Sequence, residues 1–264
     1  MKITAVQFDI QWENPFANID FLEKFIPDPK SSGMVVLPEM WSTGFTMNPM
    51  QHAEPAEQGP AFRWMMEKAK KWKCCVTGSL SVRTQEGQYR NRFYACFPDG
   101  TYRFYDKKHL FSLAGEQQFY SAGNEKKIFS YGGWNFLPLI CYDIRFPVWC
   151  RNKKNAISGM PEYDIMLVVA NWPASRRYPW KQLLIARAIE NQSYVIAVNR
   201  VGHDVNGIEH SGDSMIINPF GDVEIQAPAG ENYILQFEPD TTLLHKCRTA
   251  FPFWKDADDF FIHS

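Results

Sequence analysis

Three residues whose side chains could cooperate in hydrolysis each follow an apolar segment of the chain. Glu39 follows the run 34–37, Lys107 follows 101–105, and Cys141 follows 134–140. A deprotonated cysteine is a strong nucleophile, a carboxylate can accept its proton, and an ammonium can stabilise an oxyanion. Strand ends are where α/β folds gather such groups. Each residue alone is more typical of a buried cysteine, a surface carboxylate or a surface cation. Together they favour a cysteine-dependent hydrolase.

Cys141 lies where a predicted strand meets a predicted helix. The apolar run 134–140 follows a Gly-Gly turn, and Pro147 suits the first turn of a helix. A thiol at such a junction can be exposed at the end of a sheet, where a helix N-terminus or an ammonium lowers its pKa. Pro138 lacks the N–H that an interior strand donates, so it leaves the register of this strand open.

The positioning elements are predicted from periodicity and turn residues. Helical spacing predicts helices at 15–26, 62–72 and 180–191. Apolar or alternating runs predict strands at 2–10, 34–37, 74–82, 91–97, 101–105, 128–131, 134–140, 163–170, 194–201, 214–218, 223–227 and 233–237. Strands that alternate with helices and hairpins favour a mixed sheet or a pair of sheets with helices outside.

Composition restricts the class of protein. A chain of 264 residues with 45% hydrophobic residues is typical of one globular domain. A net charge of −1 argues against nucleic acid and anionic membranes as partners. No segment reaches the roughly 18 apolar residues of a membrane span. Six cysteines without a C-x-x-C pair are expected to be reduced thiols in the cytoplasm, with no structural metal.

Several motifs together resemble those of the nitrilase superfamily, the carbon–nitrogen hydrolases. The motifs around the three candidate residues are V-V-L-P-E (35–39), Y-D-K-K-H-L-F (105–111) and L-I-C-Y-D-I-R-F-P (139–147). Supporting matches are A-V-Q-F (5–8), R-A-I-E-N (187–191) and G-D-S-M-I-I-N-P-F-G (212–221). The matches occur in the expected order across nearly the whole chain.

The resemblance implies a fold and a set of roles. The fold is a single-domain α-β-β-α sandwich that pairs into a homodimer with further layers. Glu39 matches the general base, Lys107 the cationic stabiliser and Cys141 the nucleophile, and no cofactor or metal is implied. Glu116 matches a second glutamate that supports the lysine, and the backbone N–H of Tyr142 is a candidate oxyanion donor.

The chain is expected to divide into a hydrolase domain and a tail rich in aromatic residues. The hydrolase domain is expected over 1–240. The segment 241–264 is expected to be an aromatic tail that packs on the core or on a dimer partner.

Within the superfamily, the chain is most similar to the small ω-amidase branch, which hydrolyses dicarboxylate monoamides such as 2-oxoglutaramate and 2-oxosuccinamate. The similarity rests on V-V-A-N-W-P-A-S-R-R (168–177) and F-P-F-W-K-D-A-D-D-F (251–260). Such a substrate carries a free carboxylate, so an arginine is expected to bind it. Arg145 is one candidate, but it lies inside the family motif and is expected to orient structure. Arg176 is favoured over Arg177, and Trp172 and Phe45 are candidate walls of the pocket.

Other functions are compatible with the same residues. A nitrilase or an N-carbamoyl amide hydrolase would use the same three groups. A Cys-His hydrolase would use His109 or His210 as its base, although a structural role for His109 is favoured. A non-catalytic member that binds a small molecule would not need a base, a cation and a thiol together.

Overall fold

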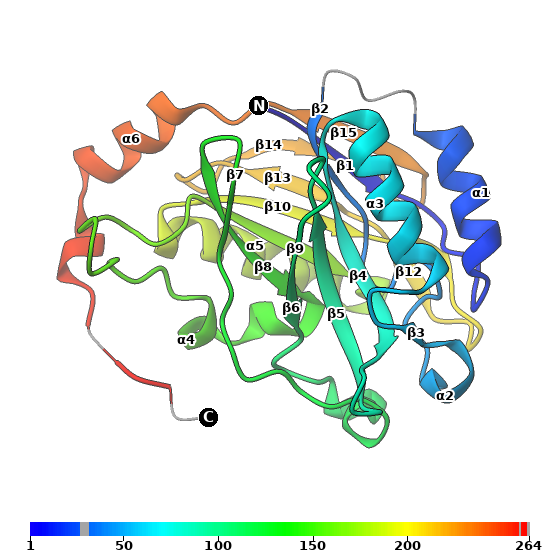
Figure 1. Ribbon diagram of the computed structural model, residues 1–264. Helices are drawn as coiled ribbons and strands as arrows, with labels where there is room; N and C mark the ends of the chain where they lie inside the picture. Colours follow the sequence, from blue (N-terminus) through cyan, green and yellow to red (C-terminus); the bar gives the residue numbers. More distant parts are fainter. Residues whose placement is uncertain (27–31, 259, 263–264) are drawn as a thin grey trace.

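The computed structural model describes residues 1–26, 32–258 and 260–262. Two mixed β-sheets pack face to face, and helices cover their outer faces (Figure 1). The α-β-β-α sandwich that the motifs imply is thereby confirmed.

The first sheet contains the N-terminal strands and one late strand. Its order is β15 (Tyr233–Phe237), β1 (Lys2–Gln7), β2 (Ser32–Val36), β4 (Cys75–Arg83), β5 (Tyr89–Cys96) and β6 (Tyr102–Asp106), and the short β3 (Glu54–Pro55) also pairs with β4. Its outer face is covered by α1 (Pro15–Phe25) and α3 (Pro60–Trp72), with apolar side chains between them. The short α2 (Pro49–His52) lies in the loop before β3.

The second sheet is formed by the C-terminal half of the chain. Its order is β14 (Val223–Gln226), β13 (Met215–Ile217), β10 (Tyr194–Asn199), β9 (Ile165–Ala170), β8 (Trp134–Ile140) and β7 (Phe129–Tyr131). Helix α5 (Arg177–Asn191) packs on its outer face, near the single turn α4 (Pro147–Cys150). A separate hairpin joins β11 (Val201–His203) to β12 (Glu209–Ser211).

Two parallel groups bring the important strand ends together. Strands β1, β2 and β4 are parallel in one sheet, and β8, β9 and β10 are parallel in the other. The carboxyl ends within each parallel group therefore lie at one edge of its sheet.

The register of β8 is regular despite Pro138. Pro138 pairs with Leu167 in an unbroken parallel register with β9. On the other side, the pairing with β7 ends at Phe136 within the described residues. Strand β8 therefore has a strand neighbour on only one side at this position, so a missing N–H can be tolerated there.

The segment 241–264 begins with a helix that the sequence pattern does not predict, α6 (Thr241–Ala250). Asp240 caps it, because its side chain accepts the N–H of Thr242 at 2.7 Å. Trp254 is buried, whereas Phe251 and Phe261 are 70% and 89% exposed. The aromatic residues are thus divided between buried and exposed positions.

Candidate active site

Cys141 begins a tight turn at the end of β8. A 3₁₀ helix, Cys141–Arg145, follows the strand directly, and α4 starts only at Pro147. Cys141 has φ of +47°, which is unfavourable for a side chain with a Cβ and is tolerated where the surroundings fix it. The expected junction is present, but its first turn is 3₁₀ instead of α-helical.

Asp143 and Arg187 hold this turn in place. The buried carboxylate of Asp143 accepts the N–H of Ile140 at 3.0 Å and the hydroxyl of Tyr105 at 2.8 Å. The Arg187 guanidinium, from α5, donates to the carbonyl of Ile144 at 2.9 Å. The strained position of Cys141 is therefore fixed by partners from three different parts of the chain.

Glu39 follows β2 and lies fully buried beside the thiol. Its Oε1 accepts from Lys107 Nζ at 2.9 Å and from Asn91 Nδ2 at 2.8 Å, and its Oε2 accepts the backbone N–H of Asn171 at 2.8 Å. The side chain of Cys141 also hydrogen-bonds to Glu39. A carboxylate with these fixed partners is positioned to take a proton from the thiol.

Lys107 lies between two buried carboxylates. Its Nζ is 2.9 Å from Glu39 Oε1 and 3.0 Å from Glu116 Oε2. Burial opposes the charge of this ammonium, but Glu116 and Glu39 outweigh it and raise the pKa of Lys107. Burial raises the pKa of Glu116, although Lys107 acts in the opposite direction. Lys107 is therefore a permanent cation in the floor of the site.

The thiol of Cys141 is protonated at rest. Burial and the negative charge of Glu39 raise its pKa well above that of a free thiol, and they outweigh Lys107 and the N–H of Asn171, which lower it. The expectation of a lowered pKa for Cys141 is wrong, because burial first, and then the carboxylate of Glu39, outweigh the ammonium of Lys107. Attack by Cys141 consequently requires a base, and Glu39 is in contact with it.

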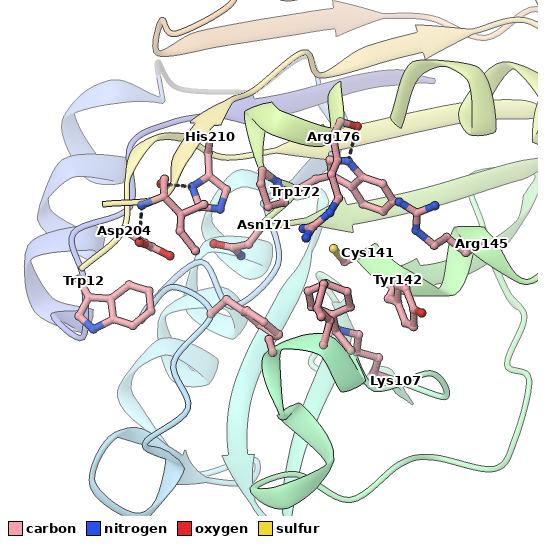
Figure 2. Close-up of a pocket in the computed structure, with 16 residues that line it drawn as sticks. Trp12, Lys107, Cys141, Tyr142, Arg145, Asn171, Trp172, Arg176, Asp204 and His210 are labelled. Atoms are coloured by element: carbon pink, nitrogen blue, oxygen red, sulfur yellow. Dashed lines mark hydrogen bonds between the residues drawn. The ribbon is translucent and has the colours of Figure 1, made fainter. Parts of the chain in front are cut away.

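A cavity of about 220 Å³ opens above these residues (Figure 2). Cys141 and Lys107 line it, whereas Glu39 and Glu116 are fully buried behind its wall. Of the residues predicted from the sequence to contact substrate, Phe45, Trp172 and Arg176 line it, as does Tyr142, the candidate oxyanion donor. The structure therefore brings these candidates together around one thiol.

Two guanidinium groups face the cavity. Arg145 lies over the ring of Trp172 at 4.7 Å, and Arg176 lies over the ring of Phe111 at 5.4 Å. Neither forms an ion pair with a carboxylate in the part of the chain that the structure describes. Arg177 differs, because it pairs with Asp213 at 2.8 Å. Of the adjacent pair, only Arg176 lines the cavity.

Neither candidate histidine is paired with the thiol. The ring of His109 hydrogen-bonds to Asp143 at 2.8 Å and stacks on Phe146, as a structural histidine would. His210 lines the cavity, but its Nδ1 bonds to the carbonyl of Ile208 at 3.0 Å. Burial, with Arg200, lowers the pKa of His210 to about 4.

Sequence reasoning misses several residues that build this site. Asn91 and Asn171 hold Glu39, Asp143 fixes the turn, and Trp12 and Asp204 line the cavity. Asn171 could have been found, because it directly follows the buried strand β9 as Cys141 follows β8. An Asn inside strand β5, such as Asn91, gives only a weak signal. Trp12 and Asp204 reach the cavity from loops, whose course periodicity does not predict.

Neither a metal site nor a membrane-spanning helix is present among the described residues. Those residues hold no group of three or more His, Cys, Asp or Glu side chains arranged to bind a metal ion. They also contain no helix with the length and apolar character needed to cross a membrane.

Comparisons with known proteins agree with this geometry. A family model described as carbon–nitrogen hydrolase matches residues 2–248. The chain is 42% identical over 260 residues to omega-amidase YafV of Escherichia coli, with 98% of both chains covered. It is 36% identical over 256 residues to 2-oxoglutaramate amidase of Bacillus subtilis, with 96% of both covered.

A solved structure is similar throughout. XC1258 of Xanthomonas campestris, described as a CN-hydrolase superfamily protein with an arsenic adduct in the active site, superposes with a TM-score of 0.94. It is 36% identical and covers 100% of this chain and 99% of its own. By motifs, fold and full-length similarity, the chain belongs to the carbon–nitrogen hydrolase family.

Proposed function

We propose that this protein is an ω-amidase that hydrolyses the terminal amide of short dicarboxylate monoamides, of the 2-oxoglutaramate type, to the acid and ammonia. The observation that carries this substrate class is the pair of unpaired guanidiniums, Arg145 and Arg176, in the same cavity as Cys141. An anionic end of the substrate would supply their partner. Relatives at 42% and 36% identity named omega-amidase and 2-oxoglutaramate amidase support the proposal.

In the proposed first half-reaction, Glu39 takes the proton of Cys141 as the sulfur attacks the amide carbon. The resulting oxyanion is stabilised by Lys107 Nζ and the backbone N–H of Tyr142. Glu39 then passes the proton to the nitrogen, the C–N bond breaks, and ammonia leaves. The raised pKa of the thiol supports this role for Glu39, since little thiolate forms without a base.

In the second half-reaction, Glu39 activates a water molecule against the thioester on Cys141. The new C–O bond forms, the C–S bond breaks, and the thiol recovers its proton. Glu116 holds Lys107 in position throughout, at 3.0 Å. All the required proton transfers are assigned to groups of this chain, and no cofactor enters the sequence of steps.

A panel of substrates tests the proposal against its nearest alternatives. Ammonia release is measured with 2-oxoglutaramate, with a neutral amide of the same length, with the matching nitrile and with an N-carbamoyl amino acid. We expect the anionic amide to give the highest kcat/KM. A preference for the nitrile or the carbamoyl compound would assign the chain to another activity of the superfamily, and no turnover of any would favour a binding protein.

We further propose that the enzyme acts as a homodimer in the cytoplasm. Phe251 and Phe261 are 70% and 89% exposed, which supports a contact between the tail and a partner subunit. All six cysteines are free thiols, as a reducing compartment maintains them. Light scattering of the double variant Phe251→Ser, Phe261→Ser tests the interface. A folded variant that remains dimeric would exclude these two side chains as essential contacts.

A further inference from the structure

The cavity extends to both sides of Cys141. In Figure 2, Arg145 lies on one side of the thiol, and Trp12, Asp204 and His210 lie on the opposite side. The proposed function uses the arginine side for the acyl part of the substrate. The opposite side, which we call the amine lobe, is bounded by Trp12, Asn171, Asp204, Ile208 and His210 and has no role in that proposal.

Asn171 presents an unused hydrogen-bond acceptor to this lobe. Its Nδ2 donates to the main-chain carbonyl of Glu39, which fixes the orientation of the amide group. Its Oδ1 therefore faces away from Glu39, and Figure 2 shows the oxygen directed toward the side of Trp12 and His210. Asn171 is 6% exposed, and Oδ1 is buried without a hydrogen-bond partner. A buried acceptor of this kind is costly unless a ligand donates to it.

The charge of the amine lobe is negative, in contrast to the arginine side. Asp204 contributes a carboxylate to the lining. Arg200, a buried cation on this side of the molecule, is already paired with Asp9 at 2.8 Å. His210, with its pKa lowered to about 4 by burial and by Arg200, adds no positive charge at neutral pH. The face of Trp12 is a further surface that attracts cations.

The lobe also reaches solvent. Ile208, which lies between Asp204 and His210 in the chain, lines the cavity and is 44% exposed. A substituent that starts near Cys141 can therefore extend past Asn171 and Asp204 toward the surface. Ammonia, the product of a primary amide, would leave this space unfilled.

We propose that the amine lobe is a subsite for the leaving-group side of N-substituted amides whose amine part carries a second, protonated amino group. This inference rests on the proposed function, because it uses the same acyl transfer to Cys141. The Sγ–C bond forms, the C–N bond breaks, and the diamine takes the proton that Glu39 received from the thiol. Asp204 and Asn171 Oδ1 accept hydrogen bonds from the distal ammonium.

Two nearly isosteric amides test the subsite. N-(2-aminoethyl)glutaramate carries an ammonium where N-propylglutaramate carries a methyl group. We expect kcat/KM to favour the aminoethyl compound by about tenfold, a moderate factor because Asp204 is partly exposed to water. The ratio should fall toward one in Asp204→Asn. It should be retained in Glu209→Gln, which removes an exposed carboxylate of the same hairpin that does not line this cavity.

The outcomes separate the two proposals. If glutaramate is hydrolysed but the wild type treats the two substituted amides alike, or if Glu209→Gln lowers the ratio as much as Asp204→Asn, the subsite is refuted and the ω-amidase stands. If no amide is hydrolysed, the proposed function fails. Calorimetry of both compounds with Cys141→Ala then decides the subsite: tighter binding of the aminoethyl compound supports it, and equal binding refutes it.

Discussion

The floor of this cavity (Glu39, Lys107 and Glu116, with the thiol of Cys141) and its rim (Arg145 and Arg176) differ in whether their charges are already paired within the protein. In the floor, Glu39, Lys107 and Glu116 are at most 1% exposed, and each charge already contacts an opposite one at 2.9 to 3.1 Å. At the rim, Arg145 and Arg176 are partly exposed and lie over aromatic rings without a carboxylate partner in the described chain. The floor is complete before substrate arrives, whereas the rim is completed by the substrate.

This difference separates two kinds of contribution to catalysis. The floor positions its charges during folding, so it needs no reorganisation when the oxyanion forms. The free-energy cost of desolvating those charges is offset by their pairing in the folded protein. Removal of one partner therefore leaves another buried charge unpaired. The rim contributes only when an anion binds. Changes in the floor should therefore affect rate and stability together, and changes at the rim should affect the choice of substrate.

The largest expected effect is the loss of turnover in Cys141→Ala. The nucleophile is removed, but alanine keeps the turn and removes no charge, so the melting temperature should stay close to that of the wild type. Mass spectrometry of the wild type with a slow substrate should show an acyl adduct on the peptide that contains Cys141. An adduct on Cys150 or Cys75 instead would contradict the assignment of the nucleophile.

Because Lys107 belongs to the floor, Lys107→Met should reduce both the turnover rate and the stability of the fold. Loss of one oxyanion donor should reduce kcat by about 100- to 1,000-fold. The two buried carboxylates that remain should also lower the free energy of unfolding by about 3 to 5 kcal/mol. Steady-state kinetics and urea denaturation measure the two effects.

Lys108→Met is the matched control for that variant. The ammonium of Lys108 lies over the ring of Trp149 at 5.5 Å, and the residue does not line the cavity. Its replacement should leave kcat and stability nearly unchanged. Equal defects in the two variants would mean that the floor has no special electrostatic role.

The floor could be predicted from the sequence to a greater extent than the rim. Glu39 and Cys141 end strands that apolar runs identify, and the motifs around them resemble one family over nearly the whole chain. The raised pKa of Cys141 could not be predicted, because it depends on the distance from the thiol to Glu39, which lies 102 residues earlier in the chain (141 − 39). A pattern along the chain contains no such distance.

The rim shows a second limit of prediction from sequence, which is the direction of side chains and the course of loops. Arg176 and Arg177 are adjacent, and sequence alone gives only the argument that their side chains diverge. The structure separates them, because Asp213 binds Arg177 while Arg176 faces the cavity. Trp12 and Asp204 enter from loops whose position depends on packing between the sheets. The sequence pattern does not predict helix α6 for a local reason, because T-T-L-L-H-K-C-R-T-A has only a short apolar stretch after its cap.

At the rim, Arg176→Met should weaken use of the anionic amide by about 2 kcal/mol in kcat/KM, the lower end for a charge left without its partner, because the site is partly exposed. The neutral amide of the same length should lose much less. Arg177→Met is the control, since its guanidinium is held by Asp213. Equal losses of kcat/KM for the two amides in Arg176→Met would disprove that Arg176 binds the substrate carboxylate. A loss confined to the anionic amide in Arg177→Met would assign that binding to Arg177 instead.

The thiol of Cys141 belongs to the floor but faces the cavity. The smallest expected effect is a shift in its pKa when a charge of the floor is removed. In the wild type, burial and the charge of Glu39 hold the pKa of Cys141 high, while Lys107 and the N–H of Asn171 act against them. Glu39→Gln keeps the volume and the burial but removes the negative charge, so the opposing groups remain and the pKa should fall. The rate of alkylation by iodoacetamide follows the thiolate. Its pH midpoint should therefore move to lower pH in Glu39→Gln, even though turnover is lost with the base.

Glu116→Gln is the matched control, because it also removes a buried carboxylate beside Lys107, at 3.0 Å, but leaves the carboxylate that contacts the thiol in place. Its alkylation midpoint should move less than that of Glu39→Gln. A midpoint in Glu39→Gln that stays unchanged or rises would show that burial alone keeps the thiol protonated. Glu39 would then act as a base without setting the resting state of the nucleophile, and the floor would be less strongly coupled than its distances indicate.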